Sequence, residues 1–367
     1  ITYEKVVETK SYQKESGGAA KQAENITTLA RGAKAIVSRY GHVYVNFEKP
    51  FSLVGCLREA GVAVPLNPGE EVPREVVVRL ANLIMQRINR CLVVTVHHLV
   101  AFVLLTNPKR GIERTPLQER VGALIEFITE RGAILSDPTR ENLAEQVDDA
   151  LRMFHKDRLI TIRQEDDDWI VSPTEEGRTL LEYYKNGIVH FFVPEALIAT
   201  ATTQLGLNGP FPREALSERT QALCHLFRAE FMCGDTEAGP GFDDVLGRFL
   251  AERLLRRDAA GLVIEPGAAP ALSYRSRVLE PFVQAYGVLA RAVLQAPPET
   301  TDNDLIKAAL KLGRKLYELG DVALSEAVSA PSMRNALACL HEDVASGRAL
   351  DLKAAATAMA ELLGVSA

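Results

Sequence analysis

The sequence predicts a mainly α-helical protein with a small α/β part at its beginning. From Val76 onward, apolar residues recur at the three- and four-residue spacing of helices that bury one face. Before that point, a strand-like stretch (Ile1–Lys10), a helical stretch (Glu24–Arg39) and an alternating stretch (His42–Phe47) follow one another. Strand, helix, strand is the order of an α/β layer.

This first part is too small to close a core. Two strands and one helix do not make a stable sheet with a buried face, so we expect partner strands upstream of Ile1. The chain also begins with Ile1 rather than Met, and no signal peptide or tag follows. We therefore predict a fragment of a longer protein, in which the strand Val43–Phe47 either has unpaired edges or is held only by the nearby helix.

The following region reads as helices around a hairpin. Its first helix carries one apolar stripe, formed by Val76, Val77, Leu80, Leu83, Ile84 and Ile88. Capping boxes at Thr115–Gln118 and Ser172–Glu175 open two further helices. Between them lie a helix (Leu143–Phe154) and two strands (Leu159–Arg163 and Trp169–Val171). Helix, helix, hairpin, helix is the order of a winged-helix unit.

A similar order recurs later in the chain. The helix Phe242–Arg257 precedes a predicted hairpin of Leu262–Ile264 with Ala271–Tyr274, and the helix Ser276–Leu294 follows. The tail, Asn303–Ala367, reads as three helices separated at Gly320, Ala330-Pro331 and Gly347. We predict three domains, an α/β remainder with linker, a helical domain with the winged-helix-like hairpin, and a second helical domain with the C-terminal helices, at residues 1–72, 73–208 and 209–367.

Charge argues against a nucleic-acid partner. The chain has 42 Lys and Arg against 48 Asp and Glu, a net charge of -6, and so offers no general basic footprint. The predicted hairpin tip, Glu165–Asp168, is acidic where a DNA-binding wing would carry Lys or Arg. The run Asp166–Asp168 lacks the Gly and Glu positions of a calcium loop and is expected to be a solvated tip.

Neither a metal nor a cofactor is predicted. The five cysteines are odd in number and contain no CxxC pair, which indicates reduced thiols in a cytosolic compartment and no zinc site. His97 and His98 are adjacent, so on a helix they point about 100° apart and do not form a metal pair.

Two apolar stretches, Cys91–Leu105 and Ile188–Leu207, are the nearest approach to membrane segments. The first is shorter than the roughly 18 apolar residues of a spanning helix, and Pro194 and Glu195 interrupt the second. We expect both to be buried core helices. The alternative is that they lie in a membrane interface, with Phe191 and Phe192 in contact with lipid.

Motifs of catalysis are missing from the sequence. It has no GxSxG elbow, P-loop, GxGxxG or HExxH, and no histidine is followed by an aspartate five positions later. His190 and His225 have glutamates at that position, Glu195 and Glu230. Both histidines lie in strongly apolar helical patterns, so we expect them to be partly buried and satisfied.

Several segments nevertheless resemble the glycerol-3-phosphate acyltransferases, in order along the chain. At the start these are Ile1–Glu8, Ser11-Tyr12, Lys14-Glu15, Gly18 and Lys21, followed by the strand Tyr40–Phe47. Later ones are the helix Leu181–Asn186 with its downstream His190, then Leu316–Gly320, Glu326–Ser329 and Asn335–Leu337.

The resemblance implies the C-terminal end of an α/β acyltransferase domain, followed by helical, winged-helix-like domains. It implies an enzyme at the cytoplasmic face of the cell membrane. Such an enzyme transfers an acyl group from acyl-CoA or acyl-carrier protein to the 1-hydroxyl of glycerol 3-phosphate. The product is lysophosphatidic acid, in phospholipid synthesis.

The family's base, the histidine of an HxxxxD motif, has no counterpart in this sequence, so no catalytic residue is assigned and the fragment is expected to be inactive. Tyr3, Glu4 and Lys21 are the substrate-binding candidates near the active-site edge, with a surface or packing role as the alternative. Three other readings stay open: a dihydroxyacetone-phosphate acyltransferase, a winged-helix regulatory protein, and a helical interaction scaffold.

Overall fold

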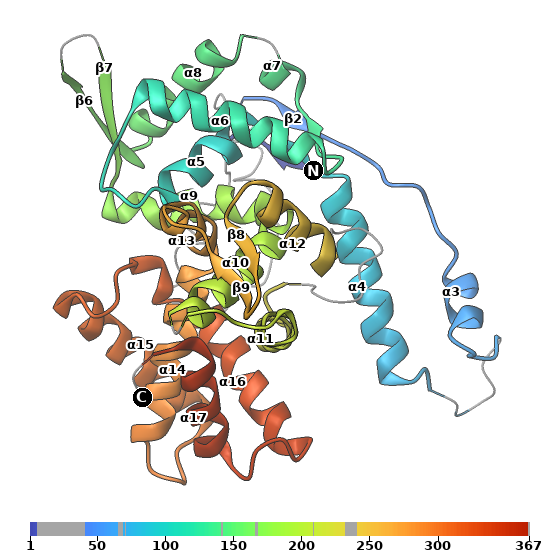
Figure 1. Ribbon diagram of the computed structural model, residues 1–367. Helices are drawn as coiled ribbons and strands as arrows, with labels where there is room; N and C mark the ends of the chain where they lie inside the picture. Colours follow the sequence, from blue (N-terminus) through green and yellow to red (C-terminus); the bar gives the residue numbers. More distant parts are fainter. Residues whose placement is uncertain are drawn as a thin grey trace.

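The structure of the chain is a computed structural model that describes residues 1–5, 41–64, 69, 71–140, 142–165, 168–207, 209–231 and 241–365. Lys21, Cys233 and the predicted helix Glu24–Arg39 lie outside these residues. The expected mainly α class is confirmed, because the sheets are small and helices form the body of the molecule (Figure 1).

The helices are α3 (Leu53–Glu59), α4 (Arg74–Arg90), α5 (Val96–Thr106), α6 (Arg114–Thr129), α7 (Asp137–Arg140), α8 (Leu143–Lys156), α9 (Glu175–Ile188), α10 (Val193–Gly206), α11 (Arg213–Leu226), α12 (Phe242–Ala251), α13 (Ala269–Ser276), α14 (Glu280–Gln295), α15 (Asp302–Leu319), α16 (Ala330–Ala345) and α17 (Leu352–Leu363), with the 3-10 helices η1 (Val189–Phe191) and η2 (Ser325–Ala327). The strands are β1 (Thr2–Tyr3), β2 (Val43–Tyr44), β3 (Val93–Val94), β4 (Ile112–Glu113), β5 (Ile134–Leu135), β6 (Ile160–Glu165), β7 (Asp168–Pro173), β8 (Leu255–Asp258) and β9 (Gly261–Ile264).

Four small sheets accompany the helices. Strands β1 and β2 pair antiparallel, β3 pairs parallel with β5, and β8 pairs antiparallel with β9. The largest sheet has the antiparallel order β4-β7-β6, and its β6–β7 hairpin projects from the body beyond α8 (Figure 1). In this hairpin Ile162 lies opposite Val171, which is fully buried against the helices.

The core is built around α5, α10 and α14. Helix α5 is apolar on all sides, and every one of its residues from Val96 to Thr106 is buried, as such a pattern requires. It packs on α9, α6 and α8, while α14 packs on α17, α15 and α16. One connected apolar cluster thus joins residues from Val94 to Leu363.

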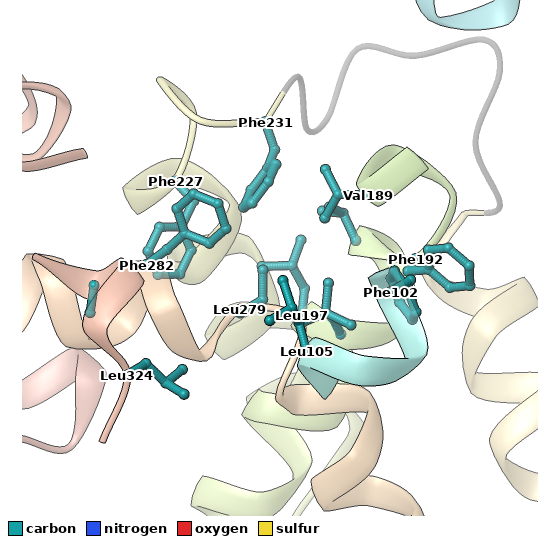
Figure 2. Close-up of a cluster of buried hydrophobic side chains, with 14 of the residues drawn as sticks. Phe102, Leu105, Val189, Phe192, Leu197, Phe227, Phe231, Leu279, Phe282 and Leu324 are labelled. Carbon is teal, nitrogen blue, oxygen red and sulfur yellow. The ribbon is translucent and has the colours of Figure 1, made fainter. Parts of the chain in front are cut away.

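This packing decides between the two readings of the apolar stretches. The structure places them in the core and not at an interface: Phe192 is 6% exposed, and its ring lies 4.1 Å from that of Phe102 and stacks on Phe127 at 5.1 Å. Figure 2 shows Phe102, Phe192 and Leu197 directed into one buried cluster. Phe191 is partly buried and packs against the same core.

In the described part of the chain, no single helix has both the length and the apolar composition to cross a membrane. The pair formed by Glu175–Phe191 and Val193–Gly206 meets the test only when taken together, across a bend of 87°.

The predicted partner of the strand Gly261–Ile264 is wrong. The partner of Gly261–Ile264 is Leu255–Asp258, whereas Ala271–Tyr274 belongs to helix α13. The tight turn explains this, because Gly261 adopts a φ of +132° and the amide of Ala260 donates to the Asp258 carboxylate.

The predicted capping box at Thr115–Gln118 does not form. Helix α6 begins at Arg114, and no side chain caps it. Instead of folding back on its own helix, Gln118 donates to the carbonyl of Ala144 at 3.2 Å and to Asp148 at 3.1 Å. The second predicted box, Ser172–Glu175, does not form either, because Thr174 and not Ser172 is the cap, and its side chain accepts from the amide of Gly177.

Helix α4 also departs from expectation. Its apolar residues were predicted to face a core, yet none of its residues is buried. Val77, Ile84 and Ile88 are 51, 41 and 50% exposed. The amphipathic pattern therefore has no partner along much of its length among the described residues.

Helix α9 connects the two ends of the helical body through buried charges. Arg178 donates to both carboxylate oxygens of Glu326 in η2, at 2.9 and 2.8 Å. Burial would raise the pKa of Glu326, but these two bonds outweigh it and hold the pKa below its usual range. Two turns further on, Lys185, which is 1% exposed, lies 3.6 Å from Glu182.

Burial raises the pKa of Glu182 from 4.5 to about 7, against the opposing effect of the Lys185 ammonium. The fold therefore favours the protonated form. The cost of ionising Glu182 is absent below its ordinary pKa of 4.5 and grows as the pH rises through 7. Lys185 limits that cost.

Gly177, in the first turn of α9, allows a close approach of two backbones. A Cβ on this residue would lie 2.2 Å from the carbonyl oxygen of Leu159 and 2.5 Å from its Cα. The Leu159 carbonyl also accepts from the amide of Thr174 at 2.9 Å, so neither backbone is free to shift.

Gly177→Ala is expected to destabilise the fold by roughly 2–4 kcal/mol, because the new methyl group overlaps backbone atoms. Gly247→Ala is the matched control, since Gly247 is also helical and no atom lies within 4 Å of its Cβ position. That change should stabilise by about 0.5–1 kcal/mol. Urea unfolding followed by circular dichroism measures both, and equal effects would contradict the predicted contact.

Lys185→Met should lower the free energy of unfolding by about 3 kcal/mol at pH 8, because it leaves an ionised Glu182 buried without its cation. At pH 5 the loss should be much smaller, since Glu182 is then protonated in the fold. The double variant Glu182→Gln/Lys185→Met should show little pH dependence. A loss for Lys185→Met that is the same at both pH values would refute the role assigned to Glu182.

Candidate functional site

The site that the sequence singled out centres on Glu4, which follows strand β1. Its carboxylate accepts three hydrogen bonds from strand β2 and the residue before it: from the amide of His42 at 2.8 Å, the His42 Nδ1 at 3.1 Å, and the Tyr44 hydroxyl at 2.8 Å. The Glu4 amide in turn donates to the carbonyl of His42 at 3.2 Å. Burial, and then the bond to Glu4, raise the pKa of Tyr44 to about 12. Tyr44 therefore stays a hydrogen-bond donor.

Gly41 makes room for this carboxylate. It adopts a φ of +71°, and a Cβ there would lie 2.4 Å from the Glu4 Oε2 and 2.9 Å from its Cβ. Both the left-handed backbone and the lack of a side chain are thus needed for Glu4 to reach the amide of His42.

Polar contacts bind this small sheet to the helical body. Lys5 pairs with Asp157, just after α8, at 2.8 Å. Asn46 donates to the carbonyl of Cys91 at 3.3 Å. Together they fix the strand pair against the helices, although its own apolar side chains stay largely exposed.

Of the three predicted site residues, only Glu4 belongs to this cluster. Tyr3 is 37% exposed and takes no part in the contacts of Glu4. Lys21 lies outside the described residues. His42 and Tyr44 could not be predicted from the sequence as partners of Glu4, because 38 and 40 residues separate them from it.

Chemically, Glu4 can orient the imidazole of His42. When Nδ1–H donates to the carboxylate, Nε2 is left as the acceptor, and the His42 side chain is 70% exposed. Such a pair can position a polar group of a ligand at the edge of the sheet. Glu4, His42 and Tyr44 line neither of the two cavities beside the β6–β7 hairpin.

His97, His98 and His190 are buried or partly buried. The same prediction is wrong for His225, which is exposed on the surface of α11, where its Nε2 lies 3.6 Å from Asp343. Burial lowers the pKa of His97 to about 4 and that of His98 to about 3, so both are neutral at pH 7. The amide of Thr95 donates to the His98 Nδ1, which makes His98 part of the α5 cap. Burial also lowers the pKa of His190 to about 4, but its Nε2 has no partner among the described residues, so it is only partly satisfied.

Glu195, five positions after His190, forms ion pairs with two arginines. It binds Arg131 at 2.6 Å and also pairs with Arg248. Across the described ranges, no three His, Cys, Asp or Glu side chains are grouped to hold a metal ion.

Comparison with known proteins gives the context of this site. A sequence model described as the glycerol-3-phosphate acyltransferase C-terminal region matches residues 12–345. A glycerol-3-phosphate acyltransferase of Shewanella woodyi is 26% identical over 340 residues, which are 89% of this chain and 40% of the relative. Those of Haemophilus ducreyi and Shewanella amazonensis are 26 and 28% identical, over 81 and 70% of this chain and 37 and 32% of their own lengths.

The chain thus spans about two fifths of the length of the first of these relatives. The match begins between β1 and β2 in the sequence and ends with the last residue of α16, so it covers the helical body except α17. On this similarity over most of its length, the chain belongs to the glycerol-3-phosphate acyltransferase family, whose C-terminal region it contains.

Proposed function

We propose that this chain is the C-terminal part of a glycerol-3-phosphate 1-O-acyltransferase. The whole enzyme would make lysophosphatidic acid from glycerol 3-phosphate and acyl-CoA or acyl-carrier protein, in phospholipid synthesis. The catalytic base and its aspartate would lie outside these 367 residues. The helical body would carry the end of the acyltransferase domain, with Glu4 holding the strand pair together at its edge.

The observation that carries this proposal is the uneven distribution of exposed apolar side chains. Sixteen large hydrophobic side chains are exposed among the described residues, and twelve of them lie in the first 90 positions. On the strand pair they are Ile1, Tyr3, Val43, Val45 and Phe47, and the last is 88% exposed. Such a concentration is typical of a surface that another folded part covers. A further α/β layer would supply it.

We also infer that helix α4 contacts the membrane surface at the cytoplasmic face. It carries Arg74, Arg79, Arg87 and Arg90 against one acidic residue, Glu75, in a chain whose net charge is -6. Its exposed apolar side chains and its arginines together are what an interfacial helix offers to anionic lipid. This helix takes the place of the two core stretches as the membrane candidate.

We infer a winged-helix-like arrangement for the unit that contains α5, α6, α8 and the sheet β4-β7-β6. Helices α6 and α8 precede the hairpin β6–β7 and α9 follows it, which is the expected order of helix, helix, hairpin and helix, with the hairpin in the place of the wing. We infer that this unit serves as a rigid support for the acyltransferase part. DNA binding is disfavoured by Glu165 and Asp168 at the tip.

The isolated chain should transfer no acyl group to glycerol 3-phosphate, because its sequence has no base–aspartate pair of the family type. A chimera in which this chain replaces the matching part of the Shewanella woodyi enzyme should be active. Labelled glycerol 3-phosphate with acyl-CoA measures both, and dihydroxyacetone phosphate in parallel separates the two related activities.

Circular dichroism controls for folding of the chimera. A folded but inactive chimera would contradict the proposed function. Transfer above the blank by the isolated chain would place the catalytic base within these residues.

Ile84→Ser/Ile88→Ser should weaken binding to phosphatidylglycerol vesicles by roughly tenfold or more, because two apolar side chains no longer enter the lipid. The fold should survive, since both side chains are exposed. The matched control is Leu319→Ser/Leu350→Ser, which alters two exposed leucines far from α4 in the sequence. Vesicle sedimentation reports the difference, and equal binding of all three proteins would exclude α4 from the membrane contact.

A further inference from the structure

An open cavity of about 730 Å³ lies on the outer face of the β4-β7-β6 sheet. Thr161, Ile170 and Ser172 line its sheet side, since they alternate with the residues of β6 and β7 that face the core. The opposite side is formed by the loop after α5 and by Pro116 and Arg120 on the first turns of α6. Its size is that of a small organic molecule and much larger than that of one ion.

The charge of this cavity opposes that of the chain. Lys109, Arg110, Arg120 and Arg163 line it, together with a single carboxylate, that of Glu113. The chain as a whole has a net charge of -6. Within the described residues, no ion pair joins Lys109, Arg110 or Arg120 to a carboxylate. A concave surface lined by several cationic side chains attracts anions.

The cavity wall is held in place by hydrogen bonds. Asn107 is 7% exposed, and its Nδ2 donates to the carbonyls of Lys109 at 2.9 Å and Gly111 at 3.0 Å. Its Oδ1 accepts from the Nη1 of Arg120 at 3.1 Å. The guanidinium of Arg120 also lies over the ring of Tyr274, 5.6 Å from its centre. Arg120 is therefore oriented by a neutral amide and an aromatic ring, which leaves its charge available to a ligand.

Two further features favour an anion at this place. A Cβ at Gly111 would lie 2.6 Å from the Ser172 Oγ, so glycine allows the loop to press against the sheet. Helix α6 begins at the cavity, and its first turn has no acidic residue and no side-chain cap. The amides of Arg114 and Thr115 add partial positive charge there, although Pro116 has no N–H and Glu113 is the N-cap residue.

We propose that this cavity binds a phosphate ester. The phosphate lies among Lys109, Arg110 and Arg120, and the organic part lies against Ile170 and Pro116. The ester is either a free organic phosphate or a lipid headgroup, since both present the same phosphate chemistry. The site is separate from Glu4 and its partners, and the proposal does not depend on the acyl-transfer function.

The test uses the full 367-residue chain and two soluble probes in isothermal titration calorimetry. ADP represents a free organic phosphate, and dihexanoyl phosphatidic acid below its micelle concentration represents a lipid headgroup. At least one should bind, and Lys109→Gln/Arg120→Gln should weaken that binding by roughly tenfold or more, because charge-assisted bonds are lost. Glutamine at position 120 retains a donor for Asn107, and thermal melting checks that this variant folds.

The matched control is Arg152→Gln/Lys156→Gln, on α8, which removes two cations beside the opposite face of the same hairpin. It should leave the affinity unchanged. Binding of ADP alone or of the lipid alone identifies the source of the phosphate, and both results support the site. Failure of both probes at millimolar concentration would overturn the proposal. So would an equal loss in the two variants, or binding of single-stranded DNA only.

Discussion

The described fold depends on the pairing of charges along buried helix α9. Its apolar face packs on α5, and Arg178, Glu182 and Lys185 face inward as well, so each of these charges needs a partner inside the protein. Glu326 supplies that partner for Arg178, and Glu182 lies beside Lys185. Because Glu326 lies in η2, far along the chain, this pairing fixes the C-terminal helices relative to the hairpin region. Gly177 adds the close contact with Leu159 that sets the distance between α9 and the hairpin.

The two ends of the molecule are stabilised in different ways. From α5 to α17, one continuous apolar cluster is buried, with aromatic rings such as Phe102 and Phe192 in direct contact. The strand pair β1–β2 and helix α4 have little of this packing, and polar contacts such as Lys5–Asp157 join the strand pair to the body. Partly exposed ion pairs contribute little to stability, so the strand pair is held to the body more weakly than the helices are held to one another.

The phosphate cavity and the Glu4 cluster share one physical device. In each, a glycine lets a backbone segment approach a polar side chain: Gly41 beside Glu4 and Gly111 beside Ser172. In each, a hydrogen-bond partner orients a functional side chain. Glu4 orients the imidazole of His42, and the amide of Asn107 orients the guanidinium of Arg120. The first site can position the imidazole of His42, and the second presents several cations to one anion.

The sequence by itself determined the helical class, the three C-terminal helices, the β6–β7 hairpin and the family resemblance. These features rest on local periodicity, on turn residues and on colinear motifs, which are properties of neighbouring residues. Only the tertiary structure decided that Glu4 meets His42 and Tyr44, that β9 pairs with β8, and that α4 has no buried residue. Each of these depends on which distant segment packs where. Apolar spacing gives a helix an apolar face, but only the packing of the whole chain decides whether anything covers it.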